Sequence, residues 1–279
     1  MKRRILPVLC LTFSVQLLTF AGLPQPMVVY YGQARDWFGW PYVEDASVIL
    51  LSGTNEIARY DIKGSISPGV NFALYVPLDD GRDTNRYVRS ALRTGEVVSI
   101  VVEDPYDGRM TIMESNAVPA VTTPGDMILV NVTAGSDADG DQLPDQWEEI
   151  LVYWSDGVLS SIWDVNPNDD FDGDGQSNMD EFLAGTFAFL DCDYFFIEKL
   201  DRVTDQLLRI SFLSVPGKVY RLWGASLTLH EGKFDWQLEP YSRTLNGPLG
   251  EGPVEGTGFW LDFYVPLPEN CRVFKLTVQ

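Results

Sequence analysis

Two twelve-residue stretches of this chain carry oxygen-bearing side chains at positions 1, 3, 5, 9 and 12. Calcium is a hard cation that binds about six to eight oxygen atoms, and a loop with this spacing supplies them. A backbone carbonyl provides the ligand at position 7, and the Glu at position 12 can bind through both carboxylate oxygens. The sequence therefore predicts two Ca²⁺ sites. The predicted ligands are Asp137, Asp139, Asp141, Leu143, Asp145 and Glu148 in the first loop, and Asp170, Asp172, Asp174, Gln176, Asn178 and Glu181 in the second.

The register of the second loop can be tested within the sequence. A shift of two residues in either direction places Met179 or Leu183 at position 12, which removes the bidentate ligand. The alternative is a pair of acidic surface turns, since Asp-Gly runs are common in loops. Residues 137–181, however, contain fourteen Asp or Glu and no Lys or Arg. Carboxylates this dense repel one another unless a cation neutralises them. One departure is Gln142 at position 6, where the sharp turn favours Gly.

The N-terminus has the pattern of a secretory signal peptide over residues 1–21. A basic start is followed by a mostly apolar run, and Thr19 and Ala21 are small residues suited to cleavage. The alternative is an uncleaved membrane anchor, but Pro7 and Gln16 interrupt a run that is short for a membrane span. Cleavage would leave 17 basic and 40 acidic residues, a net charge of −23. We therefore expect a secreted or cell-surface protein with no membrane span after cleavage, and no nucleic acid as partner.

Two cysteines, Cys192 and Cys271, follow the signal sequence. An even pair in an exported protein predicts a disulfide, and two free thiols are the alternative. A zinc site is disfavoured because the chain has a single histidine, His230, and no CxxC motif.

Residues 27–132 read as an N-terminal β-sandwich. Apolar side chains alternate along residues 72–78, which is the period of a half-buried strand. Turn signals separate this strand from several others, and short strands at such spacing are typical of a sandwich. The expected strands are 28–32, 47–51, 57–62, 72–78, 97–103, 110–113 and 127–132.

A short segment over residues 133–190 holds both loops, and each loop is followed by a predicted helix. After the first loop, Trp147, Ile150, Leu151 and Trp154 form one apolar stripe at helical spacing. After the second, Met179, Phe182 and Leu183 are the apolar residues, and Gly185 is expected to end the helix. The apolar faces of these two helices are expected to pack against each other and against a neighbouring domain.

Residues 191–279 return to a β pattern and predict a second, C-terminal sandwich. The fold class is therefore mainly β, with two β-sandwich domains flanking a short calcium-binding loop-helix pair. The expected strands are 194–200, 207–213, 219–223, 236–238, 259–265 and 273–278.

The two loops resemble a known family of repeats. The runs Asp137–Glu149 and Asp170–Thr186 are similar to the calcium-binding thrombospondin type 3-like repeats of secreted bacterial multimodular proteins, whose loop chemistry is related to that of EF-hands and dockerins. The resemblance covers about fifty residues and implies calcium binding. A looser similarity of the C-terminal region to a small β-module implies no activity. Dockerins recognise their partner through positions 10 and 11, and the residues found here, Gln146-Trp147 and Met179-Asp180, depart from that pattern.

No complete catalytic constellation is visible, so we expect no enzymatic activity. His230 lies in an expected surface loop, and no pair of carboxylates is singled out for glycoside hydrolysis. Trp37, Phe38, Trp40 and Tyr42 could form a stacking platform for sugars, but core packing is the favoured interpretation. The same interpretation applies to Trp223, Trp236 and Trp260.

The favoured functional hypothesis is an exported, calcium-binding modular structural protein, in which calcium rigidifies an acidic joint between two β-domains. The alternative is a carbohydrate-binding or adhesive cell-surface module, accessory to polysaccharide degradation. An extracellular polysaccharide or another surface protein would be its partner, and a glycan array would separate the two hypotheses.

Overall fold

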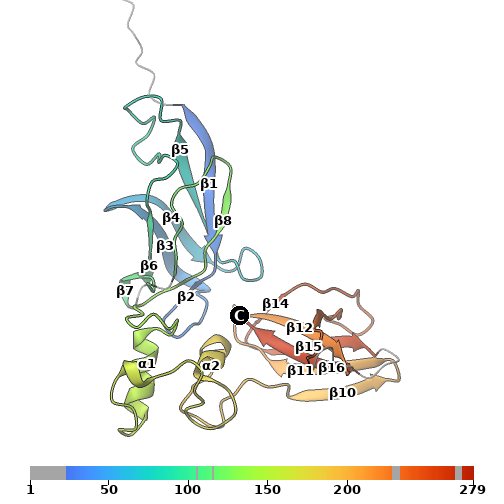
Figure 1. The fold of residues 1–279 in the computed structure, drawn as a ribbon. Coiled ribbons are helices and arrows are strands. Elements are labelled where there is room, and N and C mark those ends of the chain that lie inside the picture. Colours follow the sequence, from blue (N-terminus) through green and yellow to red (C-terminus); the bar gives the residue numbers. More distant parts are fainter. Residues whose placement is uncertain (1–22, 105, 115, 228–232, 268–271) are drawn as a thin grey trace, which may run out of the picture.

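The computed structural model describes residues 23–104, 106–114, 116–227, 233–267 and 272–279. The fold is mainly β, as predicted, and the described residues contain two short α-helices. These helices lie between an N-terminal and a C-terminal group of strands (Figure 1). No helix among the described residues has the length and apolar character needed to cross a membrane. The predicted signal peptide, His230 and Cys271 lie outside the described residues.

The N-terminal sandwich is built from two main sheets and a short strand pair. One sheet has the order β5-β1-β8, in which β1 pairs antiparallel with β5 and parallel with β8. The other has the order β4-β3-β6-β7, and β2 pairs with β9. The bounds are β1 Pro24–Gly32, β2 Ala34–Arg35, β3 Glu44–Ser52, β4 Asn55–Lys63, β5 Phe72–Asp79, β6 Ser99–Asp104, β7 Gly108–Thr111, β8 Met127–Leu129 and β9 Val132–Thr133.

Alternating side chains of both sheets form one N-terminal core. Phe72, Leu74 and Val76 of β5 are fully buried, and they pack with Val48 and Leu50 of β3. This is the period-2 pattern that the sequence predicted. The single strand expected at 127–132 is instead divided into β8 and β9, which pair with different strands.

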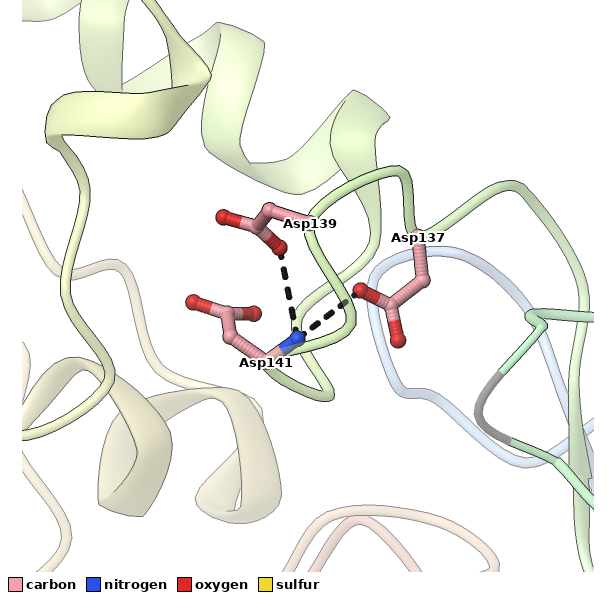
Figure 2. Close-up of side chains that lie close together, drawn as sticks. All are labelled: Asp137, Asp139 and Asp141. Atoms are coloured by element: carbon pink, nitrogen blue, oxygen red, sulfur yellow. Dashed lines mark hydrogen bonds between the residues drawn. The ribbon is translucent and has the colours of Figure 1, made fainter.

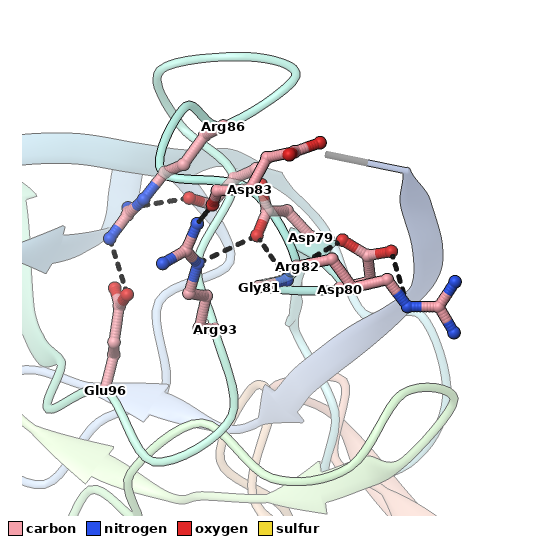
Figure 3. Close-up of polar contacts among 9 residues, drawn as sticks. Asp79, Asp80, Gly81, Arg82, Asp83, Arg86, Arg93 and Glu96 are labelled. Atoms are coloured by element: carbon pink, nitrogen blue, oxygen red, sulfur yellow. Dashed lines mark hydrogen bonds and ion pairs between the residues drawn. The ribbon is translucent and has the colours of Figure 1, made fainter. Parts of the chain in front are cut away.

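The long connection after β5 is held by charged side chains at one end of this sandwich (Figure 3). Buried Asp79 accepts hydrogen bonds from Arg93 Nε and from the Gly81 backbone, both at 2.9 Å. Arg86 pairs with Glu96 and donates to the Ala91 carbonyl at 2.7 Å. Each of these contacts is internal to residues 79–96, so the cluster is explained as a means of ordering the connection.

The segment of residues 133–190 connects the two sandwiches and is called the joint below. It contains both helices, α1 (Asp145–Trp154) and α2 (Asn178–Ala184), with a 3-10 turn at Ile162–Asp164 between them. Trp147 of α1 meets Phe182 of α2 edge-on, with ring centroids 6.0 Å apart. Phe38 of the N-terminal sandwich packs on the same cluster. The helices therefore pack together and on a neighbouring domain, as predicted. The expected stripe is shorter than the sequence suggested, because Trp154 is exposed and stacks on Phe189.

The C-terminal sandwich consists of a sheet of order β10-β11-β15 and a second sheet in which β12 pairs with β13, β14 and β16. Phe212, Tyr220 and Phe263 are fully buried in its core. The strand expected at 194–200 begins later, at Lys199. The bounds are β10 Lys199–Thr204, β11 Leu207–Leu213, β12 Val219–Ser226, β13 Gln237–Leu238, β14 Val254–Glu255, β15 Trp260–Pro266 and β16 Arg272–Val278.

Cys192 lies in the connection between α2 and β10 and is exposed, and it forms no disulfide with any described residue. Because Cys271 lies outside the described residues, the disulfide stays a prediction.

Candidate metal centre

The first acidic loop, residues 137–148, gathers three carboxylates around one turn of backbone. Figure 2 shows the carboxylates of Asp137 and Asp139 pointing towards the backbone nitrogen of Asp141. That nitrogen donates to Asp137 Oδ1 at 3.1 Å and to Asp139 Oδ1 at 3.3 Å. Oxygens of the three carboxylates lie within 4.8 Å of one another, a spacing that suits a shared metal ion. These three side chains are among the six residues predicted as ligands of this loop.

The second acidic loop, residues 170–181, repeats this arrangement. Asp170, Asp172 and Asp174 also have carboxylate oxygens within 4.8 Å of one another. Asp170 accepts hydrogen bonds from the backbone of Gly173 at 2.8 Å and of Gly175 at 2.9 Å. The first bond goes to Oδ1 and the second to Oδ2, so the loop folds around both oxygens of this carboxylate. The loop is more exposed than the first, since Asp170 lies at the surface whereas Asp137 is buried.

The glutamates at position 12 are the most unusual groups of the site. Glu148 on α1 and Glu181 on α2 are both fully buried. Burial, reinforced by the nearby aspartates, raises the pKa of Glu148 to about 9 and that of Glu181 to about 8. Both oxygens of Glu148 and Oε2 of Glu181 have no hydrogen-bond partner among the described residues. A buried, unpartnered carboxylate is costly unless a cation or a proton compensates it.

Further unpartnered oxygens occur at the other ligand positions. Asp137 Oδ2 and Asp141 Oδ2 in the first loop are buried without a hydrogen-bond partner among the described residues. In the second loop the same holds for Asp172 Oδ2, Asp174 Oδ2 and Asn178 Oδ1. The loop backbone therefore uses one oxygen of several ligand groups, while another oxygen remains available to a metal ion.

Gln142, at position 6 of the first loop, adopts the backbone conformation that Gly usually provides there. Gln142 has a φ of 81°, and Gly175 at the same position of the second loop has a φ of 100°. Both loops therefore make the same sharp turn. A positive φ is strained for a side chain other than Gly, Asn or Asp, so the first loop forms this turn at a small energetic cost.

No ion pair in the described part of the chain involves a residue of either loop. The fourteen acidic groups of residues 137–181 are thus without a local counter-charge, as the sequence indicated. The loops together could hold two hard cations through oxygen ligands.

Each loop is also attached to a neighbouring sandwich. Glu114 of the N-terminal sandwich accepts a hydrogen bond from the Asp137 backbone at 2.8 Å. Gln176 Nε2, at position 7 of the second loop, donates to the Phe195 carbonyl at 2.9 Å, and Phe195 packs on the C-terminal core. No sequence pattern indicated Glu114, because the bond joins segments that are distant along the chain.

Side chains of both sandwiches donate hydrogen bonds to carbonyls at the C-terminal end of α2. Lys218 of the C-terminal sandwich is fully buried, and its Nζ donates to the carbonyls of Phe182 at 3.2 Å and Leu183 at 2.6 Å. Trp40 of the N-terminal sandwich donates through Nε1 to the Gly185 carbonyl at 3.3 Å. Gly185 has a φ of 83° and ends the helix, as predicted. A cation at the C-terminal end of a helix is favourable.

The aromatic residues are mostly explained by packing. Phe38 belongs to the cluster between the helices, and Tyr42 packs on the N-terminal core. Trp37 stacks on Phe38 at 4.1 Å. The favoured interpretation as core residues is therefore confirmed for Phe38 and Tyr42. It is wrong for Trp40 and Trp260, whose side chains are exposed. Trp260 lies on the outer face of β15.

Comparison with known proteins found no family model, no curated protein and no solved structure that matches the chain.

Proposed function

We propose that this chain is an exported, calcium-binding structural protein in which two Ca²⁺ ions rigidify the joint between two β-sandwiches. The observation that carries the proposal is the set of buried, unpartnered carboxylate oxygens at the ligand positions of both loops, above all those of Glu148 and Glu181. A divalent cation bound by each loop would compensate these charges and complete a seven-ligand arrangement of the kind that calcium favours.

The position of α2 supports the structural part of the proposal. Glu181, the bidentate candidate of the second loop, lies in the same short helix whose last carbonyls bind Lys218. A helix of seven residues is too short to be stable by itself. Its folding would therefore depend on the metal at one end and on both sandwiches at the other, so that calcium would hold the two domains in one arrangement.

Calorimetry of the full chain is expected to give two Ca²⁺ ions, bound with a Kd on the order of 10⁻⁴ M or somewhat tighter. Mg²⁺ should compete poorly because it requires a tighter octahedral shell. Glu181→Ala should weaken the second site by about 100-fold and leave the first intact, since ligand charge sets the affinity of such loops.

The matched control for position 12 is in the first loop. Glu148→Ala should weaken the first site, whereas its exposed neighbour Glu149→Ala should change neither. The absence of calcium uptake by the unaltered chain, or equal losses for Glu148→Ala and Glu149→Ala, would overturn the proposal.

Calcium affinity is expected to rise with pH between about 5 and 8. Because the pKa of Glu148 is raised to about 9 and that of Glu181 to about 8, both groups hold a proton at neutral pH before the metal binds. Binding requires the carboxylate form, so protons are displaced, and the competition weakens as pH increases. Calorimetry at pH 7 in two buffers with different ionisation heats should reveal proton release. Identical heats in both buffers would contradict this prediction.

A further inference from the structure

An apolar pocket opens where the two sandwiches and the end of α2 meet. Its volume is about 710 Å³, and pockets for small molecules span roughly 300–1,000 Å³. Its lining combines Trp40 from the N-terminal sandwich, Gly185 at the end of α2, and residues of the C-terminal sandwich. The pocket is separate from both acidic loops, because none of their predicted ligands lines it.

Large apolar side chains at this pocket remain exposed. Trp40, Tyr194, Phe196 and Trp260 are 42%, 40%, 46% and 55% exposed, respectively. Core packing does not account for them: in the segment before β10, Phe195 and Ile197 pack on the C-terminal core, whereas Tyr194 and Phe196 are exposed. Tyr194, Phe195 and Phe196 all line the pocket. Exposed apolar side chains gathered around one cavity are characteristic of a binding site.

The charged residues that line the pocket are acidic, which favours a cationic ligand. Two acidic residues, Asp193 and Glu198, contribute to the lining, and it contains no Lys or Arg among the described residues. The chain as a whole has a net charge of −20. An anionic ligand would therefore be repelled, whereas the faces of Trp and Tyr rings attract cations.

We propose that this pocket binds a small organic cation whose body is aromatic or aliphatic. The apolar body lies against Trp40, Phe196 and Trp260, and the positive group lies near Glu198. This site uses none of the loop ligands, but it rests on the proposed function in one respect: its walls include the end of α2, which calcium is proposed to hold against both sandwiches.

Three phenyl compounds of similar size test the site: phenethylamine, 2-phenylethanol and 3-phenylpropionate, which are a cation, a neutral molecule and an anion at pH 7. Binding to the full chain in calcium-containing buffer is followed by calorimetry and ligand-observed NMR. We expect phenethylamine to bind about tenfold more tightly than 2-phenylethanol, and 3-phenylpropionate to bind more weakly still.

Substitutions locate the binding. Trp260→Ala should lower the affinity for phenethylamine by about tenfold. Phe196→Ala is a second, independent variant, and because both side chains are exposed, neither change removes a core residue. Glu198→Gln should lower the affinity for phenethylamine without changing that for 2-phenylethanol. The control is Trp163→Ala, an exposed tryptophan outside the pocket, which should have no effect. If none of the three compounds binds, if phenethylamine and 3-phenylpropionate bind equally, or if Trp163→Ala and Trp260→Ala weaken binding alike, the proposal is wrong.

Discussion

Chelation of calcium is expected to unfold the joint while both sandwiches keep their cores. Without a cation, Glu148 and Glu181 stay buried with oxygens that lack hydrogen-bond partners among the described residues, and the aspartates of each loop repel one another. The loops that precede α1 and α2 are therefore expected to unfold. The two sandwiches have separate apolar cores that include no loop residue. EDTA should therefore expose residues 137–185 to proteolysis and increase the radius of gyration in solution scattering.

The effect should reverse on addition of Ca²⁺ but not of Mg²⁺ at the same concentration. The control is the circular dichroism of the β-sandwiches, which should change little. If EDTA left both the protease pattern and the radius of gyration unchanged, calcium would have no role in the joint.

Replacement of Lys218 is expected to release the C-terminal sandwich from α2 even with calcium present. Lys218 Nζ donates to the carbonyls of Phe182 and Leu183, and burial lowers its pKa to about 7. An amine donates hydrogen bonds whether it is charged or neutral. Lys218→Met keeps a long apolar stem but removes both donors, leaving two carbonyls without this partner. We expect a loss of about 2–3 kcal/mol in the free energy of unfolding.

The same variant should increase the radius of gyration in calcium-containing buffer and weaken the second calcium site more than the first. Lys199→Met, an exposed lysine at the start of β10, is the matched control and should behave like the unaltered chain. If Lys218→Met left the scattering profile and the stability unchanged, the hydrogen bonds of Lys218 to α2 would not hold the domains together.

The local features of the acidic loops could be predicted from the sequence because their geometry depends on spacing along the chain. Asp137, Asp139 and Asp141 come together within one turn of backbone, and the same spacing brings Asp170, Asp172 and Asp174 together. The capping glycine, Gly185, likewise depends on local backbone conformation. Strand alternation at residues 72–78 was reliable for the same reason, since burial follows the period of the strand.

The exact backbone conformation and the long-range contacts could not be predicted in this way. The sequence indicated that Gln142 departs from the usual loop, and only the backbone shows that it adopts a φ of 81°. A strand was expected over residues 194–200, but it begins only at Lys199, and the residues before it include several that line a pocket. The aromatic character of Trp260 suggested burial, whereas its position on β15 places it at the surface.

The sequence by itself determined the acidic loops, the helices that follow them and the mainly β character of both ends of the chain, because each depends on residues close to one another. The tertiary structure alone decided what those elements do together. Lys218 and Trp40 are 178 residues apart in sequence, as the numbering shows, yet both bind the last turn of α2. Such contacts arise from the packing of three separate segments, whose relative positions leave no periodic signal along the chain.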